Sequence, residues 1–373
     1  MTMTPTPPPV AVAETETDAV ATPRPKSRSR NRIRAAMAGL LSLVAAVVVA
    51  RSAAQDTRID QRAVRAMTSL LPGSIEIAKP APEAPVPAPP EPAGPSADAR
   101  LRRDGYSTIR GGVLYIPETF ASQTGDYDLL LHFHGNVKVM VESAEVAKVN
   151  ALVAVINLGV GSAVYENAYA APGTYEALLS QIHNAITQRG LQSPALRRVG
   201  LSSWSAGYGA ISTILQVRRK TDPLDAVLLS DGLHCGRLPE RPSELNHRQL
   251  APFVQAARKA VTGDMLFAIT HSDIDPVTYV GSGETASYLL DAIKGEVEPV
   301  ENSPVAPEHL HLKSALNAVE PSLEKKMEPV RDVRAGGLHV RGFRGQTREH
   351  HSAHLLQMGA TLFRELAERW NKR

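Results

Sequence analysis

The sequence has little of several residue types, and each shortage excludes a class of protein. Cys235 is the one cysteine among 373 residues, which excludes an intramolecular disulfide framework. A bare cysteine in a globular protein is usually packed and unreactive, and we expect this of Cys235. A large charge of one sign is also missing, since the formal net charge is +3. Residues 1–54 alone carry +4, which leaves −1 for residues 55–373. The later part therefore lacks the basic surface that binds nucleic acid, and we expect no such partner.

Glycine-rich nucleotide-binding motifs are missing as well. The chain contains no Rossmann or P-loop signature, so we predict no nucleotide cofactor. The hydrophobic share of 43% and the charged share of 21% are ordinary for a soluble globular protein. A chain of 373 residues is long enough to bury a sizeable core in one large domain or two medium ones.

Residues 1–98 do not show the pattern of a folded domain. Residues 1–32 are rich in Pro, Thr and Ala and become basic near their end, which predicts a disordered basic N-terminus. Residues 33–50 follow, with sixteen uncharged residues in AAMAGLLSLVAAVVVA. This run is a little short for a transmembrane anchor and close to the core of a signal peptide, and both interpretations remain open. In either case the basic cluster stays cytoplasmic and the rest is exported, so we expect the later domain outside the cytoplasm, tethered to the cytoplasmic membrane or secreted.

A spacer separates this segment from the rest. Residues 51–98 contain a short helical pattern and then KPAPEAPVPAPPEPAGPSAD, whose prolines favour an extended chain. We therefore predict an accessory helix and a Pro/Ala-rich linker, followed by a single folded domain over residues 99–373.

From residue 104 onward, apolar strand patterns alternate with helical ones. The run YDLLLHFHG is continuously hydrophobic, which is typical of a central strand buried on both faces. This alternation predicts an α/β fold with a mostly parallel central sheet covered by helices on both faces. The expected strands cover 112–117, 127–135, 151–159, 197–201, 225–232, 264–273 and 338–343, and the last helix is expected to run from His354 to Trp370 as one amphipathic element.

Polar residues gather just after several of these strands, where chemistry concentrates in parallel sheets. Ser205 follows VGLSS, Asp231 follows AVLLS, and a group of histidines precedes the final helix. This order of Ser, then Asp, then His resembles that of the α/β-hydrolase superfamily over about residues 104–373. The resemblance implies the α/β-hydrolase fold and a serine hydrolase, most simply a carboxylic-ester hydrolase, that needs no cofactor or metal.

The stretch LSSWSAGYGA carries the nucleophile that the resemblance implies. Ser205 lies between a strand pattern and a helix pattern, as a nucleophile elbow requires. Ser203 stands where the motif G-x-S-x-G has its first glycine, and Gly207 keeps the second. A small side chain at 203 meets the same steric demand. The alternative is a loop that merely contains small residues; Ser202 and Ser203, within the strand, are weaker candidates.

The sequence HFHGN is the candidate oxyanion-hole segment. In the superfamily a backbone amide after the third strand joins the amide that follows the nucleophile. The resemblance therefore implies substrate-binding roles for His134, Gly135 and Asn136, together with the amide of Ala206. The rival interpretation is a metal-dependent amidohydrolase that uses the His132-x-His134 spacing.

Sequence alone leaves the acid and base partly open. Asp231 is the preferred acid because it directly ends a strand, with Asp275 and Asp273 as alternatives. His351 is the preferred base because it lies just before the final helix, with His354 as the alternative. Ser205, Asp231 and His351 are thus the predicted triad of an exported serine hydrolase. A hydrolase-fold protein that only binds its ligand is the second hypothesis.

The sequence does not identify the acyl substrate, which could be a small molecule or a polymer. Residues 295–335 form an insertion before the last strand. This insertion is expected to be either a lid that shapes the site or a surface excursion.

Overall fold

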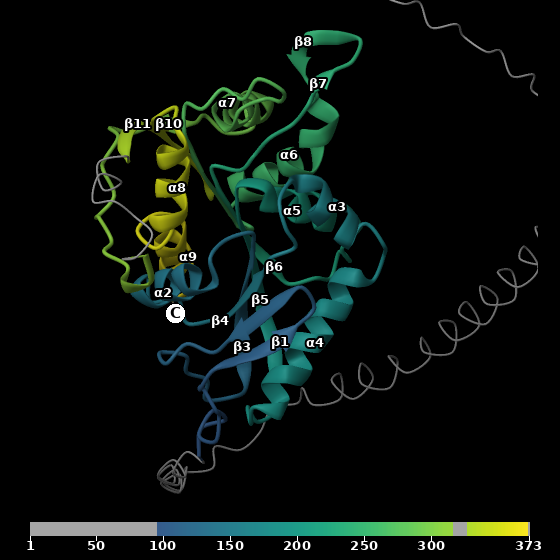
Figure 1. Ribbon diagram of the computed structural model, residues 1–373, viewed down its shortest axis with the longest axis vertical. Helices are drawn as coiled ribbons and strands as arrows, with labels where there is room; N and C mark the ends of the chain where they lie inside the picture. Colours follow the sequence, from purple (N-terminus) through teal and green to yellow (C-terminus); the bar gives the residue numbers. More distant parts are fainter. Residues whose placement is uncertain (1–94, 316–326, 372–373) are drawn as a thin grey trace, which may run out of the picture. The chain divides into compact units, whose positions relative to one another are not determined.

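The computed structural model describes residues 95–315 and 327–371 (Figure 1). The predictions for the basic N-terminus (1–32), the membrane or signal segment (33–50) and nearly all of the linker (51–98) lie outside these ranges. Within the described ranges, no helix is both long and apolar enough to cross a bilayer.

A ten-stranded sheet runs through the described part of the chain (Figure 1). Its strand order is β1-β2-β4-β3-β5-β6-β9-β12-β11-β10. The strands are β1 (Tyr106–Ile109), β2 (Gly112–Tyr115), β3 (Asp126–Phe133), β4 (Leu152–Ile156), β5 (Ala195–Trp204), β6 (Leu224–Ser230), β9 (Leu266–His271), β10 (Val300–Glu301), β11 (Glu328–Ala335) and β12 (Leu338–Arg344). A separate small sheet pairs β7 (Arg237–Leu238) with β8 (Arg241–Leu245).

The six strands in the middle of the sheet are parallel. They are β4, β3, β5, β6, β9 and β12, whereas β1, β2, β10 and β11 pair antiparallel at the two sides. All six parallel strands therefore end at the same edge of the sheet. The predicted mostly parallel sheet is confirmed.

Helices cover both faces of this sheet. One face packs against α3 (Ser162–Tyr169), α4 (Thr174–Gln188), α5 (Tyr208–Val217), α6 (His247–Val261) and α7 (Ser282–Ile293), and the other against α2 (Val137–Val146), α8 (Arg348–Leu356) and α9 (Leu362–Trp370). Short 3-10 turns form η2 (Ser205–Gly207) and η3 (Lys313–Ala315). The sheet is thus the middle layer of three.

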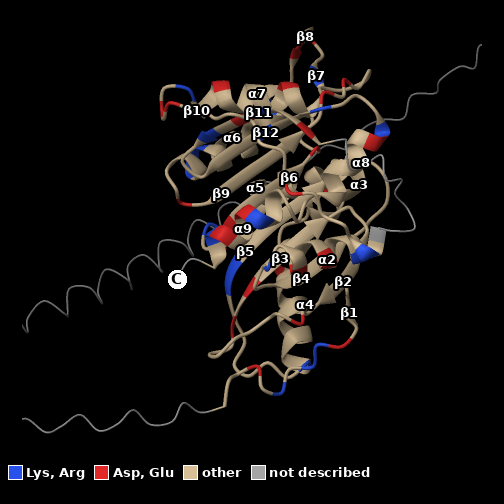
Figure 2. Ribbon diagram, turned by 90° about the vertical axis from the view of Figure 1, so that its left-hand side faces the viewer, with Lys and Arg blue, Asp and Glu red and all other residues tan. Residues whose placement is uncertain are grey.

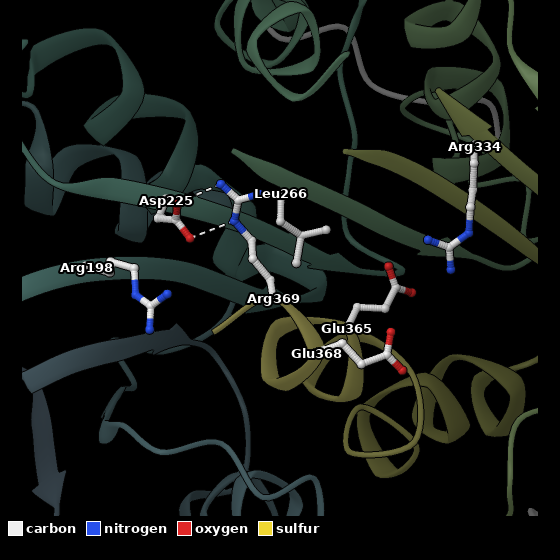
Figure 3. A pocket seen from close by; sticks show the side chains of 7 residues that line it. All are labelled: Arg198, Asp225, Leu266, Arg334, Glu365, Glu368 and Arg369. Atoms are coloured by element: carbon white, nitrogen blue, oxygen red, sulfur yellow. Dashed lines mark hydrogen bonds and ion pairs between the residues drawn. The ribbon is translucent and has the colours of Figure 1, made fainter. Parts of the chain in front are cut away.

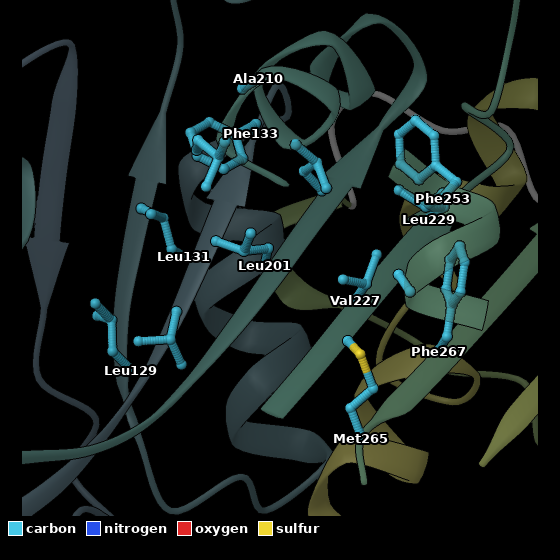
Figure 4. Packing of buried hydrophobic residues seen from close by; sticks show 14 of the residues in the cluster. Leu129, Leu131, Phe133, Leu201, Ala210, Val227, Leu229, Phe253, Met265 and Phe267 are labelled. Carbon is cyan, nitrogen blue, oxygen red and sulfur yellow. The ribbon is translucent and has the colours of Figure 1, made fainter. Parts of the chain in front are cut away.

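Strand β3 shows how the sequence produces this layering. Leu129, Leu131 and Phe133 point to the face covered by α3–α7 (Figure 4), and Leu130 points to the opposite face. The ring of His132 also lies on that opposite face, edge-on to Phe363 of α9. Successive side chains of a strand point to opposite faces, so a continuous apolar run is what a strand between two helix layers needs. The prediction for this strand is confirmed.

The predicted single C-terminal helix is wrong. The segment contains two helices, α8 and α9, separated by residues 357–361. The side chain of Gln357 exchanges hydrogen bonds with the backbone of Leu310, and a Cβ at Gly359 would press on Ser143 and Leu310. This close packing fixes the backbone in a non-helical turn, which the apolar periodicity of the sequence does not reveal.

The insertion at 295–335 is partly strand. Its last residues form β11, which pairs antiparallel with β12, and β10 extends the sheet by two residues. None of its described residues lines the cavity beside Ser205. The described part of the insertion therefore extends one side of the sheet, and the lid alternative receives no support from it.

In β3, β5 and β6 the charged residues lie toward the amino ends, so these three strands end without a charged residue (Figure 2). A cavity of about 360 Å³ opens at the amino edge, where Asp225 forms an ion pair with Arg369 (Figure 3). Glu365, also in its wall, bonds to His339 and Arg341. The charges there largely neutralise one another, so we assign this edge a structural role.

Candidate active site

Ser205 has the backbone of a nucleophile elbow. It directly follows β5 and opens the turn η2, after which α5 begins at Tyr208. Its φ is 49°, in the left-handed region that non-glycine residues rarely adopt. The residues directly after β3 and β6, His134 and Asp231, share this feature with φ of 67° and 40°. Three strained residues at neighbouring strand ends mark this edge as a candidate functional site.

Two glycines make room for the elbow. A Cβ at Gly207 would collide with the carbonyl oxygen of Phe133, where the turn crosses the end of β3. A Cβ at Gly232 would press on the backbone of Ser205 itself. Because neither position can hold a side chain, the turns after β5 and β6 can approach closely. Ser203, beneath the turn, is fully buried, as a small residue at that position should be.

Asp231 and His351 form a hydrogen-bonded pair. Nδ1 of His351 lies 2.7 Å from Oδ2 of Asp231. The same carboxylate accepts hydrogen bonds from the amide and hydroxyl of Ser272 and from the hydroxyl of Ser282. It is 2% exposed, so these donors replace the water that it has lost. The structure thus fixes a buried carboxylate behind one ring nitrogen of His351.

The strand order and the polar residues that follow three of the strands identify the fold. Parallel strands β3, β5, β6, β9 and β12 carry, in chain order, an elbow serine after β5, an aspartate after β6 and a histidine after β12. The chain has the α/β-hydrolase fold. The resemblance that the sequence indicated is confirmed at this level.

No family model and no curated protein matches the sequence. Similar solved structures include an S-formylglutathione hydrolase from Agrobacterium tumefaciens, with 12% identity over 71% of this chain and 98% of that chain and a TM-score of 0.38. A poly(3-hydroxybutyrate) depolymerase from Bordetella parapertussis has 14% identity over 70% and 86% of the two chains, with a TM-score of 0.35. A glucuronoyl esterase from Solibacter usitatus has 12% identity over 67% and 76%, with a TM-score of 0.33. The fold assignment rests on the strand order and the nucleophile elbow of this chain.

Ser205, Asp231 and His351 line one cavity of about 230 Å³. The described residues include no hydrogen bond between the Ser205 hydroxyl and His351. The remaining walls come from the loops that follow β6, β9 and β12 and from the first residues of α7 and α8. They are His234, Ile274, Pro276, Tyr279, Ser282, Gln346, Thr347 and Arg348.

Sequence reasoning missed most of these wall residues. His234 had the clearest signal, because it lies three positions after Asp231 in the loop that follows β6. Its ring stands edge-on to Tyr208 and Tyr279, and Nδ1 bonds to the carbonyl of Val280. Burial lowers the pKa of His234, so this histidine stays neutral at neutral pH. It therefore contributes a polar but uncharged wall.

The alternative acids are placed differently. Asp273 and Asp275 are exposed, and Asp273 bonds to the backbone of Gly345. No hydrogen bond joins either carboxylate to a histidine in the described residues. Asp231 is the carboxylate that the structure places against His351.

The alternative base, His354, lies one helical turn deeper. It is 1% exposed, and its Nδ1 bonds to the hydroxyl of Thr270 at 3.0 Å. Burial lowers its pKa to about 4, so it is neutral at pH 7. His350 caps the start of α8 through Thr347. Of the three histidines in this segment, His351 is the one in the cavity wall.

The pKa of Asp231 lies below its ordinary value. Burial by itself would raise it, but His354 opposes this when protonated, and the hydrogen bonds from His351 and Ser282 favour the charged form. At neutral pH we attribute the lowered pKa of Asp231 to these hydrogen bonds, because His354 is then uncharged. The carboxylate therefore stays ionised and can hold a proton on Nδ1 of His351.

The segment HFHGN is structured by its own contacts. The amide of Gly135 donates to Oδ1 of Asn157 at 2.9 Å, and Asn136 caps α2 by accepting from two helix amides. Neither these residues nor His134 and Ala206 belong to the cavity wall. Because Asn157 occupies the Gly135 amide, that amide can serve an oxyanion only after the Asn157 side chain turns away.

His132 and His134 have separate partners. Nδ1 of His132 lies 3.0 Å from the hydroxyl of Ser202, and its Nε2 lies 3.1 Å from the backbone oxygen of His134. The ring of His134 instead contacts the hydroxyl of Tyr165. The described residues contain no group of three or more His, Cys, Asp or Glu side chains placed to hold a metal ion. This geometry gives the amidohydrolase interpretation no support.

The single cysteine lies near the site without joining it. Cys235 is buried, and burial raises the pKa of its thiol to about 11. A thiol with so high a pKa carries almost no thiolate at neutral pH. The expectation that Cys235 is packed is confirmed.

Proposed function

We propose that this chain is a serine hydrolase that cleaves an ester bond. The observation that carries the proposal is the 2.7 Å contact between His351 and the buried Asp231, in a cavity whose wall also includes the elbow serine. A strained serine, an imidazole and a carboxylate that fixes the tautomer are the three parts that activate a hydroxyl.

In the proposed reaction, Nε2 of His351 takes the proton of the Ser205 hydroxyl as Oγ attacks the acyl carbon. Asp231 keeps the other ring proton on Nδ1 and stabilises the imidazolium. The bond from the acyl carbon to the alcohol oxygen then breaks, and His351 gives its proton to the leaving alcohol. Water repeats the sequence on the acyl-enzyme and releases the acid. Ser205 and His351 have to come within hydrogen-bond reach for this, as is common when substrate binds.

We propose that the amide of Ala206 stabilises the oxyanion together with an amide of the 135–136 segment. Ala206 directly follows the nucleophile, and the end of β3 lies against the elbow at Gly207. Loss of one such donor typically lowers kcat by about 10²–10³.

The reaction class is tested on p-nitrophenyl esters of rising acyl length. The wild type should hydrolyse them, lose activity after treatment with a fluorophosphonate and keep it in excess chelator. Loss in chelator with resistance to the phosphonate would overturn the proposal and favour the metal-dependent alternative. No turnover and no labelling would favour a hydrolase-fold protein that only binds its ligand.

We also propose that the hydrolase domain lies outside the cytoplasm. Support comes from the basic cluster before the apolar run at 35–50 and from the proline-rich spacer. Protease added to intact spheroplasts should digest the domain while a cytoplasmic marker protein survives. Protection of both would contradict the proposal.

A further inference from the structure

The wall of the cavity beside Ser205 includes an exposed arginine, Arg348. Arg348 lines the cavity, and none of the described residues forms a hydrogen bond or ion pair with its side chain. Most arginines in the described part of the chain do have such partners; Arg344, four positions earlier, pairs with Glu328 at 3.1 Å. An unpaired cation in the wall of a candidate active site is available to a ligand.

Arg348 lies close to the catalytic groups because of the helix that carries it. It is the first residue of α8, three positions before His351. Residues three apart on a helix share a face, with about 5–6 Å between their Cβ atoms. An acyl group attached to Ser205 would therefore have the guanidinium one helical turn from the base.

No carboxylate among the described wall residues pairs with the guanidinium of Arg348. Asp231 is the one carboxylate among the described wall residues, and its oxygens are occupied by His351, Ser272 and Ser282. Glu349, the neighbouring acid on α8, receives the hydroxyl of Thr347 and is absent from the wall. The same wall also includes Ile274, Pro276 and Tyr279, whose apolar surfaces suit a short carbon chain.

We propose that Arg348 selects esters whose acyl group carries a carboxylate a few carbons from the scissile carbonyl. This inference rests on the proposed function. A guanidinium can bind a carboxylate through two parallel charge-assisted hydrogen bonds. The bound anion would also offset the positive charge that otherwise opposes the imidazolium forming on His351. Binding and the chemical step would thus favour the anionic substrate.

The test compares mono-p-nitrophenyl succinate with p-nitrophenyl butyrate, which has the same acyl length without the charge. The wild type should prefer the succinate ester, and Arg348→Gln should lower that kcat/KM ratio by about 10- to 100-fold. Arg348→Lys should fall between them, since it keeps the charge without the paired hydrogen bonds. Arg344→Gln is the matched control and should keep the wild-type ratio.

Wild-type indifference to the charge, or an unchanged ratio in Arg348→Gln, would overturn the role of Arg348. Hydrolysis of neither ester, with no phosphonate labelling, would instead overturn the proposed function. A second measurement needs no variant: added salt should reduce the preference for the succinate ester in the wild type, because screening weakens the ion pair. A salt-independent preference would also contradict the role of Arg348.

A separate feature, a stack of three rings, adjoins the nucleophile. The indole of Trp204 lies on the ring of His351, with centroids 4.7 Å apart and planes at 28°. The ring of His134 also stacks on this indole, with centroids 5.3 Å apart and planes at 6°. Nε1 of Trp204 also donates to the backbone oxygen of His351 at 3.0 Å. The residue before Ser205 therefore holds both the ring and the backbone of the candidate base.

We infer that Trp204 is a positioning residue for His351. The indole face fixes the plane of the imidazole while Asp231 fixes its Nδ1 edge. An aromatic face within about 6 Å also attracts a cation, so it stabilises the imidazolium formed during the reaction. Trp204 thus helps His351 to accept the proton of Ser205, without touching the substrate.

The test is the pH profile of kcat/KM for Trp204→Leu and Trp204→Phe. In the leucine variant the plateau should fall, chiefly through kcat, and the acidic limb should move down by roughly half a pH unit, because protonation of His351 is less favoured. The phenylalanine variant should restore the position of this limb. The control is Trp370→Phe, which changes a tryptophan bonded to Asp225 at the amino edge. A uniform loss at every pH, with no shift of the limb, would overturn the inference.

Discussion

Replacing Ser205 with alanine is expected to lower kcat by about 10⁴- to 10⁶-fold. The proposed reaction needs Oγ as the attacking atom, and no other side chain lies at the elbow to replace it. The melting temperature should stay nearly unchanged, because alanine and serine meet the same backbone constraint at a φ of 49°. Steady-state hydrolysis of p-nitrophenyl esters and thermal unfolding measure the two effects.

Ser212→Ala is the matched control for this change. Ser212 lies on α5, seven positions after Ser205, and is absent from the cavity wall. It should keep wild-type kcat. An active Ser205→Ala variant would show that the elbow is not the source of the nucleophile.

Asp231→Asn should lower kcat by about 10⁴-fold, as the same change does in a Ser-His-Asp triad. The carboxylate accepts from four groups, His351 Nδ1, the Ser272 amide, and the hydroxyls of Ser272 and Ser282. The side-chain NH₂ of asparagine would point its own N–H donors at these donor groups, where the carboxylate offers an acceptor. His351 would then favour the tautomer with its proton on Nε2, which cannot take a proton from Ser205.

Asp273→Asn and Asp275→Asn provide the comparison, since both carboxylates are exposed. Each variant should remain within a few-fold of wild-type kcat. Greater damage from either of these than from Asp231→Asn would contradict the assignment of the acid.

The layering of the fold could be predicted because it depends on local patterns. The apolar run in β3 indicates burial on both faces, and the amphipathic pattern of α4 indicates a covering helix. The turn at Ser205 was also visible, since small residues stand between a strand pattern and a helix pattern. These features need only near neighbours in the sequence.

Features that depend on distant residues could not be predicted. The break between α8 and α9 results from packing of Gly359 on Leu310 and Ser143, which lie 49 and 216 residues earlier in the chain. Three candidate acids follow strands: Asp231, Asp273 and Asp275. Only the fold shows that Asp231 is the one surrounded by Ser272, Ser282 and His351. The stack of His134, Trp204 and His351 joins three chain segments for the same reason.

The central claim, that Ser205 is the nucleophile of a hydrolase, is tested most directly by locating a covalent adduct. The full chain is treated with a fluorophosphonate, digested, and mapped by mass spectrometry. We predict one phosphonylated residue, Ser205, with labelling lost in Ser205→Ala and strongly slowed in His351→Ala. An adduct on another serine, or ester hydrolysis that continues without any adduct, would contradict the account.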